Sequence, residues 1–169
     1  MLKVCLGTYK GYNEGNYGEW IDISDFKDVT ELQNYIKKKF KESDPEYMVQ
    51  DAEAFTDTLG ESPKLEDLFT LDELMKEYGE DSIDALQDAV EIGGIENASE
   101  MMENLIGDSE TMTEVIYEDA CSRLEAVEGD RNKQFFQDLI DRYDWRDDVP
   151  VWEANGAVYS GSHGNYFWR

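Results

Sequence analysis

Residues 42–122 contain 25 acidic side chains and only two basic ones, Lys64 and Lys76. The flanking segments are nearly neutral, with six acids and seven bases in residues 1–41 and nine acids and six bases in residues 123–169. The net charge of -25 at pH 7 is therefore concentrated in the middle of the chain. This run constrains the fold, because each element in it must turn its acids toward solvent and bury an opposite apolar face.

The acidic segment has the periodicity of amphipathic helices. From Leu65 to about Gly129, apolar residues recur every three or four positions, which places them on one face of each helix. Further stripes contain Ile116 and Phe135 and predict two more helices. The first three stripes stop at glycines, the residue type that most often ends a helix. The predicted stops are Gly79, Gly93-Gly94 and Gly107.

Strand patterns occur at both ends of the chain. A helix over residues 30–40 is expected between the second and third N-terminal strands. After Pro150 the chain is predicted to form strands, with Asn155-Gly156 as a hairpin turn and a second turn at residues 161–164. The three expected N-terminal strands are residues 2–8, 19–23 and 46–53.

These patterns predict the α+β class, with a small α/β domain at each end and an acidic helical domain between them. The length of 169 residues is compatible with two or three small domains. We expect a three-stranded sheet and a helix in residues 1–60 and the acidic helices in residues 61–108. Residues 109–169 are expected to form helices and a terminal β-hairpin.

Carboxylates line the predicted helices in rows. Neighbours in such a row lie about 5–6 Å apart, and like charges at this spacing destabilise a helix by a few tenths of a kcal/mol per pair. A sequence selected only for stability would intersperse lysines, so we interpret the rows as a surface that binds a partner. The predicted surface consists of Asp72, Glu73, Glu77, Asp81, Asp84, Asp88, Glu91, Glu96, Glu100, Glu103, Glu114 and Glu118.

The spacing of these carboxylates suggests what they imitate. Duplex DNA carries about one charge per 1.7 Å of its axis, whereas one acidic row supplies roughly one per 5 Å at a rise of ~1.5 Å per residue. Two or three rows side by side would approach the charge density of DNA. The expected target is then a protein that holds DNA in a basic groove. The alternative is that amphipathic helices of a soluble protein simply expose charge.

Several other functional classes do not fit the sequence. Direct nucleic-acid binding requires a basic footprint, which this chain lacks. Neither a signal peptide nor an apolar run of membrane-spanning length is visible, so we expect a soluble cytoplasmic protein with no membrane partner. The two cysteines, Cys5 and Cys121, have no metal-binding spacing and are expected to be reduced thiols. The one histidine, His163, lies in a Gly-Ser-His-Gly turn, and no catalytic residue is predicted.

No cofactor or metal motif is present either. The chain lacks the phosphate-binding glycine loops, and the EF-hand spacing of acids and glycine appears nowhere. We therefore predict no cofactor, no metal site and no enzymatic activity. Because carboxylates are calcium ligands, an acidic calcium-binding regulator stays as an alternative.

The first third of the chain carries a specific motif. Tyr12-Asn13-Glu14-Gly15 is followed by Gly18 and by Trp20 in the second expected strand. Glu46-Tyr47, Val49, Asp51 and Glu53 follow on the third strand. This pattern resembles the ArdA antirestriction proteins. We interpret Tyr12, Asn13, Glu14, Gly15, Gly18 and Trp20 as structural, with glycine in the tight turn and Trp20 in the core of the sheet.

The resemblance implies an elongated chain of three small domains that forms a homodimer, with residues 109–169 as the expected dimer contact. It implies a DNA mimic carried by plasmids, transposons and phages. Such proteins inhibit type I restriction-modification enzymes by occupying the DNA-binding groove of the specificity and methyltransferase subunits. An alternative is inhibition of another DNA-binding defence system, such as a CRISPR effector or a methylation-based phage-exclusion system.

Overall fold

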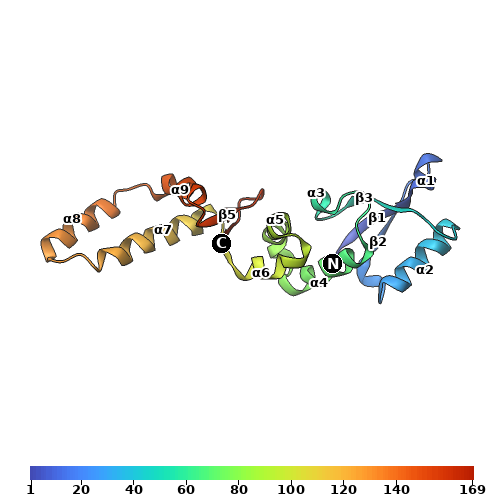
Figure 1. Ribbon diagram of the computed structural model, residues 1–169, viewed down its shortest axis with the longest axis horizontal. Coiled ribbons are helices and arrows are strands. Elements are labelled where there is room, and N and C mark those ends of the chain that lie inside the picture. Colours follow the sequence, from blue (N-terminus) through green and yellow to red (C-terminus); the bar gives the residue numbers. More distant parts are fainter. The chain divides into compact units, whose positions relative to one another are not determined.

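A computed structural model describes all of residues 1–169, which divide into two compact units, Met1–Ser99 and Glu100–Arg169 (Figure 1). Each unit combines helices with a small antiparallel sheet, and this confirms the predicted α+β class. The finer division into three domains, with boundaries after residues 60 and 108, stays a prediction. None of the helices has the length and apolar character needed to span a membrane.

Unit 1 begins with a three-stranded antiparallel sheet. The central strand β1 (Lys3–Thr8) pairs with β2 (Glu19–Asp22) on one side and with β3 (Tyr47–Ala52) on the other. Helix α2 (Val29–Phe40) buries an apolar face that includes Leu32 and Ile36. The sheet and the helix of the N-terminal prediction are thus confirmed.

Short segments connect these elements. The loop expected after β1 contains the short helix α1 (Tyr9–Asn13), and a 3-10 turn η1 (Ile23–Asp25) follows β2. Helix α2 starts at Val29, one residue before the predicted range, and Asp28 caps it. The Asp28 carboxylate accepts a hydrogen bond from the Glu31 amide at 2.9 Å.

The second half of unit 1 is helical. Helix α3 (Thr56–Leu59) precedes α4 (Leu65–Tyr78) and α5 (Ile83–Gly93). Two helix ends agree with the predicted stops, because Gly79 and Gly94 follow α4 and α5 with positive φ angles of 81° and 76°. The 3-10 turns η2 (Glu80–Ser82) and η3 (Ile95–Asn97) complete unit 1, and helix α6 (Ala98–Glu103) begins at its end and continues into unit 2.

Unit 2 contains a helical hairpin and a second sheet. The prediction that a helix extends to Gly107 is wrong, because Leu105–Gly107 forms strand β4 and α6 ends at Glu103. Strand β6 (Tyr166–Trp168) lies between β4 and β5 (Val158–Ser160), and both pairs are antiparallel. The helical elements are α7 (Ser109–Leu124), α8 (Asp130–Ile140), the 3-10 turn η4 (Trp145–Asp148) and α9 (Val149–Ala154).

The terminal hairpin forms at the second of the two predicted turns, residues 161–164, and not at Asn155-Gly156. Pro150 lies in the first turn of α9, where a missing amide hydrogen breaks no helical hydrogen bond. Asn155 caps the end of α9, so Asn155-Gly156 ends a helix and does not join two strands. The strands are joined by residues 161–165, where the Gly161 amide donates to the Asn165 carbonyl at 2.9 Å.

The two units differ in the size of their cores. Most of the buried apolar side chains of the protein lie in unit 1, and Leu68 and Leu71 of α4 are completely inaccessible to solvent. The core cluster of unit 2 is small and consists of Met112, Ile116, Val149 and Val158. Unit 2 therefore holds its helices with few buried contacts.

Candidate functional site

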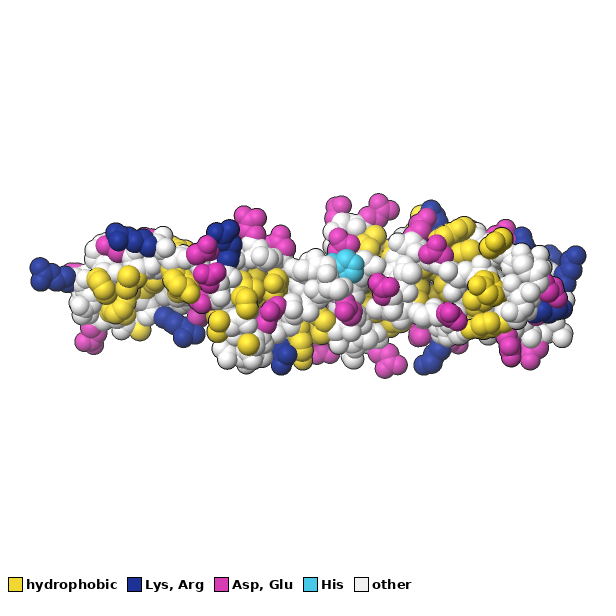
Figure 2. All heavy atoms as spheres, turned by 90° about the horizontal axis from the view of Figure 1, so that it is seen from above, with side chains coloured by type: hydrophobic (Ala, Val, Ile, Leu, Met, Phe, Trp, Pro, Cys, Tyr) yellow, Lys and Arg dark blue, Asp and Glu magenta, His cyan; other side chains and the backbone are white.

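The predicted acidic surface lies on six helical elements, α4, η2, α5, η3, α6 and α7. Ten of its twelve carboxylates are exposed to solvent. None of these ten takes part in an ion pair. Acidic side chains project from both units on the face drawn in Figure 2. The ten exposed residues are Glu73, Glu77, Asp81, Asp84, Glu91, Glu96, Glu100, Glu103, Glu114 and Glu118.

The two bases within residues 42–122 do little to neutralise this surface. The Lys76 ammonium pairs with the Asp72 carboxylate, with Nζ and Oδ2 2.5 Å apart. Lys64 is exposed and is the only base of the segment without a carboxylate partner. The negative potential of the central helices is therefore almost uncompensated within the chain.

Two exposed acids extend the predicted rows and were missed by the sequence prediction. On α4, Glu66 lies within about 20° of Glu73 around the helix axis, at ~100° per residue. On α7, Glu110 precedes Glu114 by four residues and so begins the same row. The spacings of seven and four residues in the sequence could have identified both.

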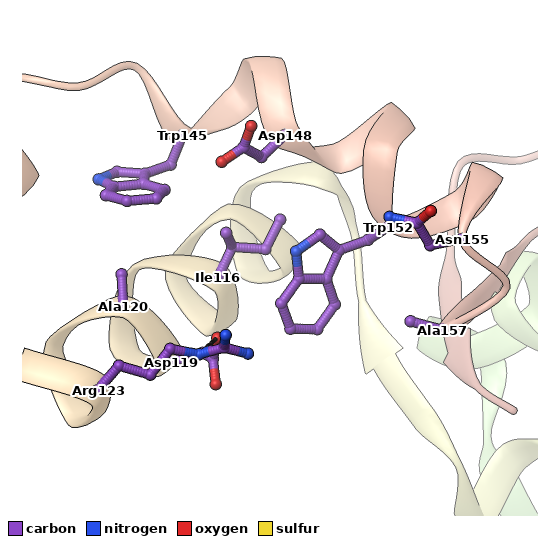
Figure 3. A pocket seen from close by; sticks show the side chains of 9 residues that line it. All are labelled: Ile116, Asp119, Ala120, Arg123, Trp145, Asp148, Trp152, Asn155 and Ala157. Carbon is purple, nitrogen blue, oxygen red and sulfur yellow. Dashed lines mark ion pairs between the residues drawn. The ribbon is translucent and has the colours of Figure 1, made fainter. Parts of the chain in front are cut away.

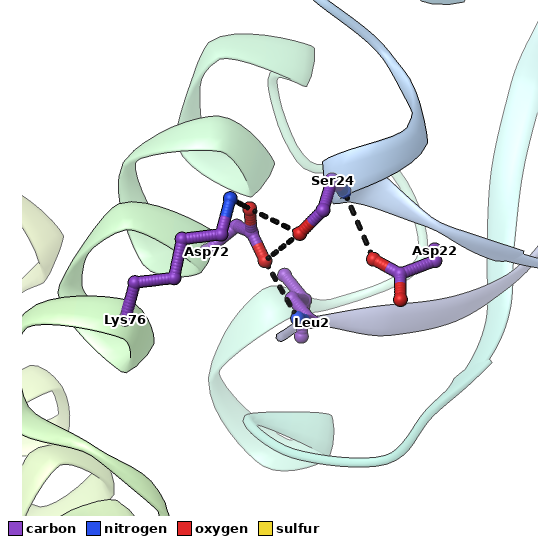
Figure 4. Close-up of polar contacts among 5 residues, drawn as sticks. All are labelled: Leu2, Asp22, Ser24, Asp72 and Lys76. Carbon is purple, nitrogen blue, oxygen red and sulfur yellow. Dashed lines mark hydrogen bonds and ion pairs between the residues drawn. The ribbon is translucent and has the colours of Figure 1, made fainter.

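Asp72 has to be removed from the predicted surface, because it is only 2% exposed. Its Oδ1 accepts the Leu2 amide at 2.8 Å, and its Oδ2 accepts the Ser24 hydroxyl at 2.9 Å and the Lys76 ammonium (Figure 4). The carboxylate thus links the start of β1, the turn η1 and helix α4. Its role is structural, because these partners use the oxygens that a binding partner would need.

The electrostatics of Asp72 agree with this structural role. Burial alone would raise the pKa of the carboxyl group. The hydrogen bonds from Lys76, the Leu2 amide and Ser24 outweigh burial and hold the pKa of Asp72 below its usual range. The same contact raises the pKa of Lys76, so both groups stay charged near neutral pH.

Asp88 is the second correction, because it is completely buried. It was predicted to stand on the solvent face of α5, opposite Leu86 and Val90. In the structure the buried stripe of α5 is wider and includes Ala85, which lies only about 60° from Asp88 around the helix. Asp84 and Glu91 of the same row stay exposed.

The residues of the N-terminal motif are only partly structural. Gly15 has a φ angle of 79° and closes a turn by donating to the Tyr12 carbonyl at 3.0 Å. A side chain at Gly18 would come within 2.8 Å of the Leu6 backbone, so only glycine fits there. Trp20, however, is 49% exposed and is not a core residue. Because side chains alternate along β2, Ile21 points into the core and Trp20 points away from it.

The other side chains in the first part of the motif, residues 12–20, are exposed as well. Tyr12 is 56% exposed, and Asn13 and Glu14 beside it also face solvent. Tyr12, Asn13, Glu14 and Trp20 therefore contribute surface, while Gly15 and Gly18 shape the backbone.

No three His, Cys, Asp or Glu side chains are placed to hold a metal ion together. The buried thiol of Cys5 has a raised pKa, because burial and the nearby Asp51 carboxylate both disfavour the thiolate. Cys5 is thus a poor nucleophile. The feature that best fits a function is the exposed acidic surface.

Comparison with known proteins identifies a family. A family model described as Antirestriction protein (ArdA) matches residues 4–164, which is almost the whole chain. No curated protein matches the sequence. The match includes both the N-terminal motif and the acidic helices.

Proposed function

This chain belongs to the ArdA family of antirestriction proteins, and from that premise we propose that it acts as a non-enzymatic mimic of DNA. Its target is a type I restriction-modification enzyme. The protein occupies the DNA-binding groove of the specificity and methyltransferase subunits and so keeps DNA out.

The observation that carries this proposal is the set of ten exposed carboxylates without a cation partner. Helical stability does not favour such a surface, because neighbouring like charges repel. A groove that binds DNA phosphates presents lysine and arginine side chains. Such a groove would supply the cations that the acidic surface lacks, so the two surfaces are complementary in charge.

The spacing of the carboxylates supports the mimicry. On α7, Glu110, Glu114 and Glu118 follow one another at about 6 Å along the helix axis. One strand of DNA carries about one phosphate per 3.4 Å of axis. Two such rows side by side would approach the charge density of one DNA strand, and within unit 1 the contacting helices α4 and α5 both carry exposed acids, among them Glu73, Glu77 and Asp84.

We also propose that the protein acts as a homodimer and that α8 forms the contact. Phe135, Phe136 and Leu139 of α8 are 60%, 45% and 50% exposed, although they are large and apolar. The face drawn in Figure 2 shows hydrophobic side chains gathered on the part of unit 2 that holds α7 and α8. An exposed apolar patch of this kind is typical of a protein interface.

Charge favours the same contact. Two copies repel each other strongly at -25 each, except where their facing surfaces are close to neutral. Residues 123–146 contain six acids and five bases, so they are nearly neutral. A dimer through α8 therefore leaves the acidic helices of both copies free for the target.

The proposal is tested by measuring DNA cleavage by a purified type I enzyme after incubation with the protein. We expect the protein to block both DNA binding and cleavage. A variant that neutralises four exposed acids of α4 and α5 should raise the half-inhibitory concentration about ten-fold or more. This variant carries Glu73→Gln, Glu77→Gln, Asp84→Asn and Glu91→Gln.

A matched control separates the location of the charge from its amount. The control variant removes four exposed acids outside the central helices through Asp25→Asn, Glu125→Gln, Glu128→Gln and Asp147→Asn. It should inhibit nearly as well as the wild type. Undiminished cleavage at a large molar excess of wild-type protein would rule out the type I target. Equal losses in both variants would contradict a localised binding surface. Inhibition should also weaken steeply as salt rises.

A further inference from the structure

Unit 2 contains a cleft that is not part of the acidic surface. It has a volume of about 450 Å³ and lies between α7 and the segment formed by η4 and α9. Trp145, Asp148 and Trp152 come from that segment, and Asp119 lies on α7 across from them (Figure 3). The cleft therefore combines two indole rings with two carboxylates.

The two indole rings are held in place by their neighbours. The Trp145 Nε1 donates a hydrogen bond to the Ile140 carbonyl at 2.9 Å, and its ring meets the Tyr143 ring edge-to-face at 4.7 Å between centroids. The Trp152 ring lies 6.0 Å from the ring of Trp168. The walls of the cleft are thus formed before any ligand arrives, which lowers the entropic cost of binding.

The carboxylates make the cleft negative. Asp148 accepts the Tyr143 hydroxyl at 3.0 Å and has no lysine or arginine at ion-pair distance. Asp119 pairs with Arg123 at 2.8 Å, but the Arg123 side chain is 78% exposed. An exposed pair of this kind is weak, so Arg123 can turn away into solvent. The cleft therefore has room for one more cation beside Asp148.

This combination of groups selects a guanidinium. A guanidinium is flat and stacks on an indole face, and its N–H groups form a fork that matches a carboxylate. An anion would be repelled by Asp148. An apolar ligand would cover the Asp148 carboxylate without replacing its contacts with water.

We infer that this cleft binds an arginine side chain of the target protein, with the guanidinium stacked against Trp145 or Trp152 and paired with Asp148. The inference rests on the proposed function, because a groove that binds DNA presents arginines to its ligand. It adds a defined pocket to a surface that otherwise works through distributed charge. A stacked, partly desolvated contact of this kind is less sensitive to salt than the exposed carboxylates are.

The first experiment tests whether the cleft binds arginine in the full chain, with no target enzyme present. The probe is arginine with both termini capped, and the measurement is the NMR signals of the four tryptophan indole N–H groups. We expect the signals of Trp145 and Trp152 to shift with a dissociation constant on the order of 10 mM. Trp20 of unit 1 should not shift. Capped citrulline, which has the same shape and no charge, should leave all signals unchanged.

Two substitutions at neighbouring residues test whether the cleft contributes to inhibition of the target enzyme. Asp148→Asn removes the charge in the cleft and keeps an oxygen that can accept the Tyr143 hydroxyl. Asp147→Asn removes the same charge from an exposed position that does not line the cleft. We expect Asp148→Asn to weaken both capped-arginine binding and enzyme inhibition about five- to ten-fold. Asp147→Asn should change neither by more than about two-fold.

The outcomes separate this inference from the proposed function. The inference is overturned if no indole signal shifts at ~50 mM capped arginine, if citrulline acts like arginine, or if Trp20 shifts as much as Trp152. It is also overturned if the wild type inhibits the enzyme and both substitutions reduce inhibition equally. Failure of the wild type to inhibit a type I enzyme would instead refute the proposed target, and the capped-arginine titration would still decide whether the cleft binds a guanidinium.

Discussion

The two units differ in how far their apolar side chains are buried. Unit 1 buries most of them and leaves only Met1, Tyr12, Tyr17 and Trp20 exposed among its large hydrophobic residues. Unit 2 has a small core, while eight of the twelve exposed large hydrophobic residues of the protein lie in it. Unit 1 is therefore stabilised from within, and unit 2 presents surface that a partner can cover.

Charge differs between the units in a related way. Unit 1 carries 24 acids and nine bases, and unit 2 carries 16 acids and six bases. In unit 1 the bases lie mainly before residue 42, away from the acidic helices. In unit 2 all six bases lie after residue 122, from Arg123 at the end of α7 to Arg169. Acidic α7 and mixed α8 thus offer different surfaces, which the proposed function assigns to a basic groove and to a second copy.

The largest expected effect tests the difference in cores. Leu71→Ala in unit 1 removes a completely buried side chain and should lower the free energy of unfolding by about 2–5 kcal/mol. Leu139→Ala in unit 2 removes a half-exposed side chain and should change it by less than about 0.5 kcal/mol in the monomer. Urea unfolding at low protein concentration measures both. Similar losses would contradict the contrast between the units.

The next effect concerns Asp72, whose buried carboxylate forms contacts within unit 1. Asp72→Asn should lower the free energy of unfolding by about 2–3 kcal/mol, because it weakens the buried hydrogen bonds to Leu2 and Ser24 and removes the charge that faces Lys76. The adjacent exposed residue gives the control. Glu73→Gln should change stability by less than about 0.5 kcal/mol in the same urea titration. A comparable loss in Glu73→Gln would show that exposed and buried acids do not differ in role.

The contribution of Asp72 should also depend on pH in a defined direction. Its pKa in the folded protein is lowered, so folding favours the ionised form. The stabilisation is therefore complete above the pKa of the unfolded chain, near 3.9, and is lost as pH falls through the folded value. The stability gap between wild type and Asp72→Asn should stay constant from about pH 5 to 8 and shrink below about pH 4. A gap that persists in acid would mean that packing, and not charge, accounts for it.

A smaller effect tests the partner surface of unit 2. Leu139→Glu places a charge in the apolar face of α8 and should weaken dimerisation about ten-fold or more, which corresponds to about 1.4 kcal/mol. Gln134→Glu adds the same charge to the opposite face of α8 and is the control. Sedimentation velocity over a range of concentrations measures both. If the two variants dimerise equally well, α8 is not the contact.

Local patterns predicted local structure well. Gly79 and Gly94 end helices as expected, because a left-handed or extended glycine after an apolar stripe is a signal contained in a few neighbouring residues. The sequence predicts strands after Pro150, but Pro150 lies in the first turn of α9. Proline is common at this position of a helix. Such ambiguities arise where one residue type suits two conformations.

Long-range contacts account for the errors at the candidate site. Asp72 and Glu73 are adjacent acids on the same predicted helix, yet only the first meets Leu2 and Ser24 from distant parts of the chain. Helical spacing places Asp72 on the buried face of α4, four residues after Leu68 and three before Met75, but it does not identify these distant partners. Trp20 was placed in the core because of its size, but its position in the alternation of β2 turns it outward. The rows of exposed acids were mostly predicted, because exposure along a helix follows from spacing alone.

The smallest effect concerns the N-terminal caps of the helices, which differ between the units. Helix α2 of unit 1 is capped by the Asp28 carboxylate, whereas α8 of unit 2 follows Gly129 and has no side-chain cap. Asp28→Ala should therefore cost about 1 kcal/mol of unfolding free energy, because the Glu31 amide loses its acceptor. Asp28→Ser restores an acceptor and should recover most of the loss in urea unfolding. If serine and alanine are equally destabilising, the charge of Asp28 near the positive end of α2 matters more than its hydrogen bond.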